Sequence, residues 1–355
     1  MTGASGLVGA QVVRTLLGAG HEARALVRRD SDTRQLRSLG VPVVQADLCD
    51  PATLRPAFEG CETVFHCAAV FAYWDITREE LARANVEGTR EVLRAAAAAG
   101  VRRVVVTSSS VTCGSSDGPV PRDENGMPGE EYLPDYFLTK LEQERTALAS
   151  GTELGLEVVA ACPTIVVGGP DRRLVPSNAL LTRYLADPLR TTFPGGCNIV
   201  SVRDVAHGHV LLAEHGTAGE RYLLGGENWA WRTIHQTVSE LCGTHGPWAT
   251  ATHTAAYLAA TLAEIRAVLS ARPPATTRAE ARTMGRYYWY RHEKAALLGY
   301  TPRPARQALA EALGWLVTSP HVPDRVRSGL RPHPEVLGAR ELIPRKLDDG
   351  AGAPS

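Results

Sequence analysis

The sequence predicts an α/β protein that is built on a doubly wound parallel sheet, with a smaller, mostly helical region after it. Short apolar segments alternate with segments of helical spacing from residue 2 to residue 167. The apolar segments are almost continuously hydrophobic, as are parallel strands that are covered on both faces. A glycine-rich turn near the amino terminus leads directly into helical spacing. These three observations together favour a βαβ chain over an all-helical or all-β one.

The individual elements follow in order along the chain. The expected strands are residues 21–27, 41–46, 63–69, 101–110 and 156–167, and the expected helices are residues 10–17, 51–60, 79–99 and 136–149. Asp50 stands where it can cap the second helix. Gly, Pro and acidic residues crowd residues 114–135, which predicts a surface loop.

The domain boundaries are less regular than the elements. Residues 1–167 form the dinucleotide-binding domain that the alternation predicts, and residues 198–215 return to it as a strand and a helix. Residues 168–197 and 216–316 make up the second region, where we expect the substrate to bind. Residues 317–355 are rich in Pro, Arg and Gly, which predicts an extended or disordered tail.

The first strand of the sheet looks truncated, because Met1 alone precedes the turn that starts at Thr2. In a doubly wound sheet the strand before such a turn lies at the centre, where unpaired backbone groups are costly. We therefore expect low stability unless another segment fills the central position. One hypothesis is that the natural protein begins about five to eight residues upstream, which is an ordinary strand length.

The composition excludes several classes of partner. The chain has 355 residues, with 38 basic and 38 acidic side chains, so it offers neither a nucleic acid nor an anionic membrane a charged footprint. Its seven cysteines are irregularly spaced, which indicates reduced thiols in a cytoplasmic protein. His207 and His209 are two residues apart on a helix, so they do not share a face and no metal site is expected. The sequence leaves a homodimer open.

The turn over residues 2–9 predicts a site for a dinucleotide pyrophosphate, since a helix amino terminus after a glycine-rich turn presents free N–H groups. Gly3 allows the tight turn, Gly6 lets the phosphate approach, and Gly9 lets the helix pack closely. The remaining residues that we expect to contact the cofactor in this turn are Ser5, Leu7 and Val8.

The end of the next strand predicts which dinucleotide binds. Sites for NAD usually carry an acidic residue there, which bonds the ribose 2′-hydroxyl. This chain has Arg28 and Arg29 instead. A guanidinium suits a 2′-phosphate, so the sequence favours NADP(H) over NAD(H).

A second informative stretch begins at Tyr136, four residues before Lys140. On a helix these two side chains share a face, and a neighbouring cation lowers the pKa of a phenol from its usual value of about 10. Such a tyrosine can transfer a proton near neutral pH. Ser108, Ser109 and Ser110 stand at the carboxyl end of a strand, where ligands bind in open α/β sheets.

These motifs resemble the extended short-chain dehydrogenase/reductases, the NAD-dependent epimerase/dehydratase superfamily. Within it, the chain is most similar to enzymes of the dihydroflavonol 4-reductase and 3β-hydroxysteroid dehydrogenase types. The resemblance runs from residue 2 to about residue 316 and implies a Rossmann fold. It rests on the turn at residues 2–9, on Asp47-Leu48, on Asn85-Val86-Glu87-Gly88-Thr89, on Thr107-Ser108-Ser109 and on Tyr136-Phe137-Leu138-Thr139-Lys140.

The resemblance also implies roles for single residues. Tyr136 would protonate the carbonyl oxygen as the general acid, and Lys140 would tune Tyr136 and hold the nicotinamide ribose. Ser109 would bond the same oxygen, with Ser108 as the alternative. The other implied cofactor contacts are Asp47 and Leu48 beside adenine, Ala68 and Ala69 on the nicotinamide side, and Pro163 in the loop over the nicotinamide. Asn85 would brace the strand ends, and we expect His66 to be a hydrogen-bonded core histidine.

We therefore expect an NADPH-dependent ketone reductase, or the reverse alcohol dehydrogenase, acting on a small apolar or aromatic carbonyl compound. Phe71, Tyr73 and Trp74 can line an apolar pocket, and the cluster at residues 287–290 either joins them or belongs to the core. One alternative is a nucleotide-sugar epimerase that retains NAD. Another is a non-catalytic NADP-binding sensor or scaffold, which usually lacks the tyrosine or the lysine.

Overall fold

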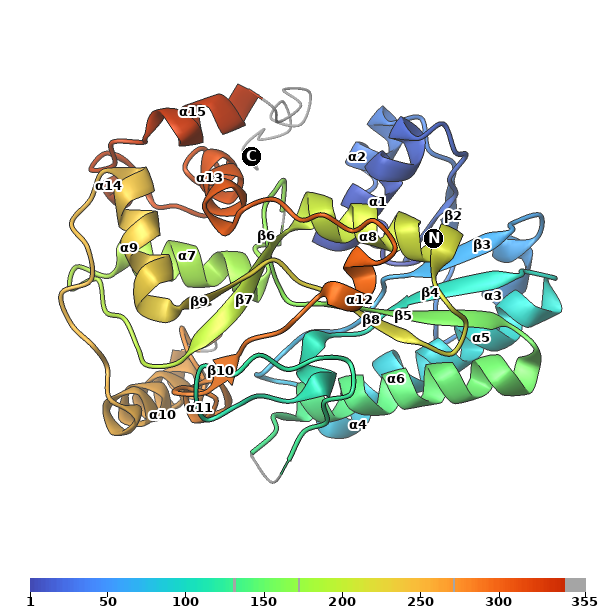
Figure 1. Ribbon diagram of the computed structural model, residues 1–355, viewed down its shortest axis with the longest axis horizontal. Helices are drawn as coiled ribbons and strands as arrows, with labels where there is room; N and C mark the ends of the chain where they lie inside the picture. The colour runs from blue at the N-terminus through green and yellow to red at the C-terminus, as the bar shows by residue number, and fades with distance from the viewer. Residues whose placement is uncertain (130–131, 172, 271, 342–355) are drawn as a thin grey trace.

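The structure is a computed structural model that describes residues 1–129, 132–171, 173–270 and 272–341 (Figure 1). Its larger sheet contains β3 (Thr63–His66), β4 (Arg103–Thr107), β5 (Glu157–Pro163) and β8 (Arg221–Leu224), all of them parallel. A parallel pair, β1 (Ala25–Val27) and β2 (Val43–Gln45), lies beyond the β3 edge. The fold class that we expected from the sequence is confirmed.

Met1 and Thr2 lie between β1 and β3, in the central position of the sheet. Thr2 forms parallel bridges to Leu26 on one side and to His66 on the other. The Leu26 amide donates to the Met1 carbonyl at 2.7 Å, and the Thr2 amide donates to the Phe65 carbonyl at 3.0 Å. These two residues join the strands into the order β2-β1-Thr2-β3-β4-β5-β8. Only Thr2 forms the bridges, so the first strand is truncated, as expected, and its remnant occupies the central position at the carboxyl ends of the neighbouring strands.

Helices cover both faces of this sheet. Figure 1 shows α1 (Leu7–Gly18) and α8 (Val202–His215) on one face, and α3 (Pro51–Phe58), α5 (Gly88–Ala98) and α6 (Asp135–Leu154) on the other. Alternate residues of β4 enter the two layers. Val105 packs in the cluster of Val13 from α1, whereas Val104 and Val106 pack in the cluster of Leu54 from α3.

Several expected elements differ in extent from the observed ones. The helix expected at residues 79–99 consists of α4 (Arg78–Ala82), a π-helical turn (Arg83–Glu87) and α5. Asp50 does cap α3, where its carboxylate accepts a hydrogen bond from the Ala52 amide. A short helix that the sequence analysis missed, α2 (Arg34–Ser38), follows β1.

The second region has its own sheet, so it is less helical than expected. This sheet holds β6 (Ile165–Val167), β7 (Gly196–Ser201), β9 (Glu227–Ala230) and β10 (Tyr287–Tyr288). The single strand expected at residues 156–167 breaks at Thr164, and its two parts enter different sheets. β8 belongs to the larger sheet rather than to the second region, and β7 belongs to the smaller one.

Helices of the second region pack around α13 (Ala305–Leu316), near α7 (Pro176–Ala186) and α9 (Trp231–Cys242). Residues 317–341 fold against the same core as α14 (Asp324–Arg327) and α15 (Pro334–Glu341), with Val322, Leu330 and Val336 buried. The expectation of an extended or disordered tail is therefore wrong for this stretch, whose apolar side chains find a core. Residues 342–355 lie outside the described residues. The remaining helices are α10 (His253–Ser270), α11 (Arg278–Arg282) and α12 (Glu293–Ala296).

Candidate active site

The glycine-rich turn has the backbone geometry that only glycines allow. Gly3 has a φ of 67°, and a Cβ on it would lie 2.6 Å from the Ala68 nitrogen. A Cβ on Gly9 would lie 2.1 Å from the Gly3 carbonyl oxygen. The close approach at Gly9 is thus to the turn itself rather than to a strand. The turn is pressed against the end of β3, which places it at the carboxyl edge of the sheet.

The amino terminus of α1 is open to a ligand. Its N-cap residue, Gly6, is exposed and has no side chain to cap the helix, so the first N–H groups have no side-chain acceptor among the residues that the structure describes. A Cβ on Gly6 would meet only the Gly3 oxygen, at 3.3 Å. Ser5 and Val8 are partly exposed beside it, whereas Leu7 is buried. The turn therefore fits the pyrophosphate of a dinucleotide.

Neighbouring strand ends carry the other expected cofactor residues. Arg28 and Arg29 follow β1 and are exposed. Asp47 and Leu48 follow β2, and the Asp47 carboxylate accepts from the Cys49 amide at 2.9 Å. Ala68 and Ala69 follow β3.

Asn85 is bonded to the backbone that follows β3, and Pro163 lies within β5. Asn85, in the π-helical turn, forms two hydrogen bonds with the Val70 backbone, at 2.7 and 2.9 Å, so its bracing role is confirmed. Pro163 is buried at the last position of β5, paired with Leu224, rather than in the loop beyond. The loop position was wrong because the main-sheet strand continues up to Pro163.

Lys140 brings α6 to the end of β4. Its ammonium donates to the Thr107 carbonyl at 2.8 Å and to Gln143 Oε1 at 2.6 Å. Burial lowers the pKa of Lys140 to about 8, against the opposing effect of Glu144. An ammonium has three N–H groups, and these two acceptors are the ones it has among the described residues.

Tyr136 lies one turn before Lys140 and is partly buried. Burial raises its pKa, whereas the sequence led us to expect that Lys140 lowers it. The expectation was wrong because burial disfavours the charged phenolate and is the only cause of the shift that the described residues supply. The Tyr136 phenol is therefore protonated across the neutral pH range.

The strand-end serines have different environments. Ser108 is buried and donates to Glu144 Oε2 at 2.5 Å. Ser109 is partly exposed, and within the described part of the chain its hydroxyl accepts only a long bond, 3.4 Å, from the Val111 amide. Of the two alternatives, Ser109 is the hydroxyl that remains accessible to a ligand.

A chain of buried polar side chains, which sequence reasoning missed, connects the turn to Lys140. Thr2 Oγ1 and His66 Nδ1 lie 2.7 Å apart, and His66 Nε2 lies 2.8 Å from Thr89 Oγ1. Gln143 then donates to the same Thr89 hydroxyl at 2.8 Å and accepts from Lys140. His66 is a hydrogen-bonded core histidine, as expected. The signal available in the sequence was the polar Gln143 on the buried face of α6.

Aromatic side chains surround Tyr136. The ring of Phe71 lies 4.2 Å from that of Tyr136, edge to face, and Tyr73 packs on both. The ring of Tyr288 lies 6.1 Å from that of Phe137, which in turn lies 6.2 Å from that of Tyr136. Tyr290 instead belongs to the core, where its hydroxyl donates to the Gly114 carbonyl. The cluster at residues 287–290 is therefore divided between the site and the core.

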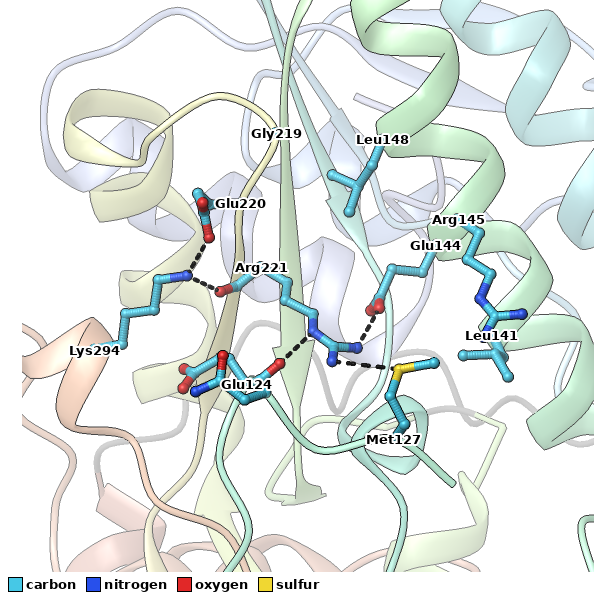
Figure 2. A pocket seen from close by; sticks show the side chains of 11 residues that line it. Glu124, Met127, Leu141, Glu144, Arg145, Leu148, Gly219, Glu220, Arg221 and Lys294 are labelled. Atoms are coloured by element: carbon cyan, nitrogen blue, oxygen red, sulfur yellow. Dashed lines mark hydrogen bonds and ion pairs between the residues drawn. The ribbon is translucent and has the colours of Figure 1, made fainter. Parts of the chain in front are cut away.

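A separate cavity of about 300 Å³ lies between α6 and β8 (Figure 2). Four of its charged side chains form two ion pairs: Arg221 with Glu144 at 2.8 Å, and Lys294 with Glu220 at 2.6 Å. None of the expected catalytic or cofactor residues lines it. Within the described ranges, no three His, Cys, Asp or Glu side chains gather as metal ligands, and no helix is long and apolar enough to cross a membrane.

Comparisons with known proteins agree with this geometry. The model of the NAD dependent epimerase/dehydratase family matches residues 1–225. A putative dihydroflavonol 4-reductase from Synechocystis is 33% identical over 324 residues, which cover 89% of this chain and 93% of that protein. Cinnamoyl-CoA reductase 1 from Oryza sativa is 30% identical and covers 91% of each chain.

The fold also matches solved structures. The crystal structure of gox2253 superposes with a TM-score of 0.79 at 35% identity, covering 91% of this chain and 98% of that one. A nucleoside-diphosphate-sugar epimerase from Pseudomonas aeruginosa has a TM-score of 0.71 at 23% identity, with 91% and 98% covered, which is a likeness of fold.

Proposed function

The chain belongs to the NAD-dependent epimerase/dehydratase family, and we propose that it is an NADPH-dependent ketone reductase for small apolar or aromatic carbonyl compounds. Membership and its reductase relatives make it an NAD(P)-dependent oxidoreductase of the extended short-chain type. The observation that carries the proposal is the position of Tyr136, whose phenol is protonated and stands against Phe71 and Tyr73.

The dinucleotide that this family uses would lie on the turn of Gly3, Gly6 and Gly9, and a reduced nicotinamide supplies the hydride when bound. The chain's own residues supply the rest. Tyr136 holds a proton on Oη and delivers it to the carbonyl oxygen of the substrate. The Lys140 ammonium would hold the nicotinamide ribose with its remaining donor capacity, and Ser109 donates a hydrogen bond to the same carbonyl oxygen. The aromatic side chains exclude water from the reacting carbonyl.

Replacing Tyr136 by Phe tests the proposal. The variant removes the proton donor and keeps the ring that packs on Phe71, so turnover should fall by about 10²–10⁴-fold, the usual worth of general acid catalysis. NADPH binding, followed by fluorescence titration, should stay near that of the parent. NADPH oxidation across a panel of aromatic ketones is the assay, and Tyr257→Phe, on a helix of the second region, is the control. An unchanged turnover number would remove Tyr136 from the mechanism.

The preference for NADP(H) rests on Arg28. The position of Met1 and Thr2 makes β1 the second strand of the βαβ unit, and Arg28 follows it, exposed, where an acidic side chain would repel a 2′-phosphate. Arg28→Ala should weaken NADPH by about one to two decades, the worth of a charge-assisted contact, and NADH much less. Titration of both dinucleotides measures this, and equal losses would contradict it. A purified chain that retains NAD and interconverts sugar nucleotides would instead indicate an epimerase.

A further inference from the structure

Thr89, on α5, is the point where three lines of buried hydrogen bonds meet. Its hydroxyl donates to the Asn85 carbonyl at 2.6 Å. The Gln143 side-chain amide donates to the same hydroxyl oxygen at 2.8 Å, and His66 Nε2 lies 2.8 Å from it. Thr89, Asn85 and Gln143 are fully buried. Because the Thr89 side chain is enclosed in this way, it can act on a bound ligand only through its neighbours.

The hydrogens around Thr89 have a single arrangement. A threonine hydroxyl carries one hydrogen, and that of Thr89 is donated to the Asn85 carbonyl, so His66 Nε2 must donate to Thr89. Burial lowers the pKa of His66 to about 3, so the ring is neutral and its Nδ1 has no hydrogen. Nδ1 therefore accepts from the Thr2 hydroxyl, 2.7 Å away. Reversing any of these bonds would leave a buried donor without an acceptor, which is costly.

The line toward α6 ends at the Lys140 ammonium. This group donates to Gln143 Oε1 at 2.6 Å. An ammonium is a donor only, so the amide oxygen of Gln143 faces Lys140 and its nitrogen faces Thr89. The Thr89 hydroxyl thus holds the amide that in turn holds Lys140.

The other two lines end on the backbone that follows β3. Through His66 the first line reaches Thr2, whose hydroxyl oxygen accepts from the Ala68 amide at 3.3 Å. The second line reaches Asn85, whose side chain forms two hydrogen bonds with the Val70 backbone, at 2.7 and 2.9 Å. One hydroxyl therefore connects the backbone of residues 68–70 to α6.

We propose that Thr89 is a positioning residue for the nicotinamide half of the dinucleotide, acting through Lys140 on one side and Ala68 on the other. The inference rests on the proposed function in taking these two residues as the contacts of that half. Without the Thr89 hydroxyl, His66 and Gln143 each keep a buried N–H that has lost its acceptor, so both must shift. The adenosine half lies toward the ends of β1 and β2, beyond these hydrogen bonds.

Replacing Thr89 by Val keeps the shape of the side chain and removes its hydroxyl. NADPH affinity, measured by fluorescence titration, should fall by about tenfold, the lower end for a hydrogen bond to a charged group. Affinity for adenosine 2′,5′-bisphosphate, which lacks the nicotinamide ribose, should stay near that of the parent. The same comparison is made with NADH and ADP, so a chain that prefers NAD(H) tests the inference equally.

Three further variants separate positioning from a general loss of structure. Thr89→Ser keeps the hydroxyl and should bind NADPH nearly as the parent does. Thr89→Ala lacks the hydroxyl but cannot clash with its neighbours, so it should share the loss of Thr89→Val even where that variant folds poorly. Thr182→Val is the matched control, because Thr182 is also buried on a helix and donates to a backbone carbonyl, that of Ala179. It should leave both affinities unchanged.

A double variant tests the route through α6. If Thr89 acts through Gln143, the losses of NADPH affinity in Thr89→Val and Gln143→Leu should combine to less than their sum. Strictly additive losses would overturn the proposal. So would equal losses for NADPH and the bisphosphate, an unchanged NADPH affinity, or a Thr89→Ser variant as weak as Thr89→Val. All these measurements are of binding, so they are independent of whether the chain reduces ketones.

Discussion

Two buried charges on α6, one turn apart, have opposite surroundings. The Glu144 carboxylate accepts from Ser108, Thr112 and Arg221, at 2.5, 2.9 and 2.8 Å, and lies 3.2 Å from Cys162 Sγ. Lys140 has only the Thr107 carbonyl and Gln143 among the described residues. Both side chains are almost fully buried, so burial alone does not separate them.

The difference separates a structural charge from one that can serve a ligand. Glu144 has a partly buried ionic partner, Arg221, and additional donors, so its desolvation is compensated within the fold. Lys140 keeps donor capacity and has a lowered pKa, which is typical of a functional cation in its free state. The comparison therefore predicts that Glu144 matters mainly for stability and Lys140 mainly for cofactor binding and turnover.

The largest expected effect is that of Glu144→Gln. Neutralising this side chain leaves the partly buried Arg221 without its ionic partner, so the free energy of unfolding should fall by about 3 kcal/mol, the lower end for a broken buried pair. Denaturant titration measures this. Glu142→Gln, an exposed change on the same helix, is the matched control and should cost little.

For turnover, we expect the Lys140 substitution to have a larger effect than the Glu144 substitution. The folded fraction of Glu144→Gln should turn over close to the parent rate, whereas Lys140→Met should lose turnover far more than stability. If Glu144→Gln and Lys140→Met changed stability and turnover equally, Glu144 would not be a structural charge distinct from a functional Lys140.

The sequence was most informative where chemistry requires particular residues at fixed spacing. Gly3 and Gly9 could be identified because no other residue fits their backbone, and Tyr136 and Lys140 because helical spacing places them on one face. The pKa direction of Tyr136 was not predictable, since it depends on how deeply tertiary packing buries the phenol.

Topology beyond the first domain was harder to predict for a physical reason. A continuously apolar run such as residues 156–167 does not reveal that it changes sheet at Thr164. The Pro- and Arg-rich composition of residues 317–341 concealed Val322, Leu330 and Val336, which are few but buried. In the sequence, Arg221 looks like an ordinary residue of a short strand. Its ion pair with Glu144 depends on the tertiary fold, which the sequence does not reveal.

A smaller effect is expected from Gln143→Leu. The change removes one acceptor of Lys140 and the donor to Thr89, while the Thr107 carbonyl still holds the ammonium. NADPH affinity should fall by about tenfold, the lower end for a hydrogen bond to a charged group. Fluorescence titration measures it, and Gln143→Glu, which keeps an acceptor for Lys140, should recover most of the loss. An unchanged dissociation constant would show that Thr107 alone positions Lys140.

The last expected effect is a loss of stability at acid pH, caused by buried histidines near Lys140 and elsewhere in the core. Burial, with Lys140 nearby, lowers the pKa of His66 to about 3, and burial lowers that of His209 to about 4. His66 Nε2 bonds Thr89, and His209 Nε2 lies 2.9 Å from Thr107 Oγ1.

In the unfolded chain these histidines bind protons below about pH 6.5, whereas in the folded chain they do not. Stability is therefore full above that pH and declines as the pH falls toward 4. Each histidine should cost about 2 kcal/mol by pH 5. Burial also lowers the pKa of His235 to about 4, so three histidines contribute. Denaturant titrations at pH 7.5 and pH 5 measure the decline, and His66→Gln should reduce it by about a third. A variant with the parent's full decline would show that other groups produce the acid sensitivity.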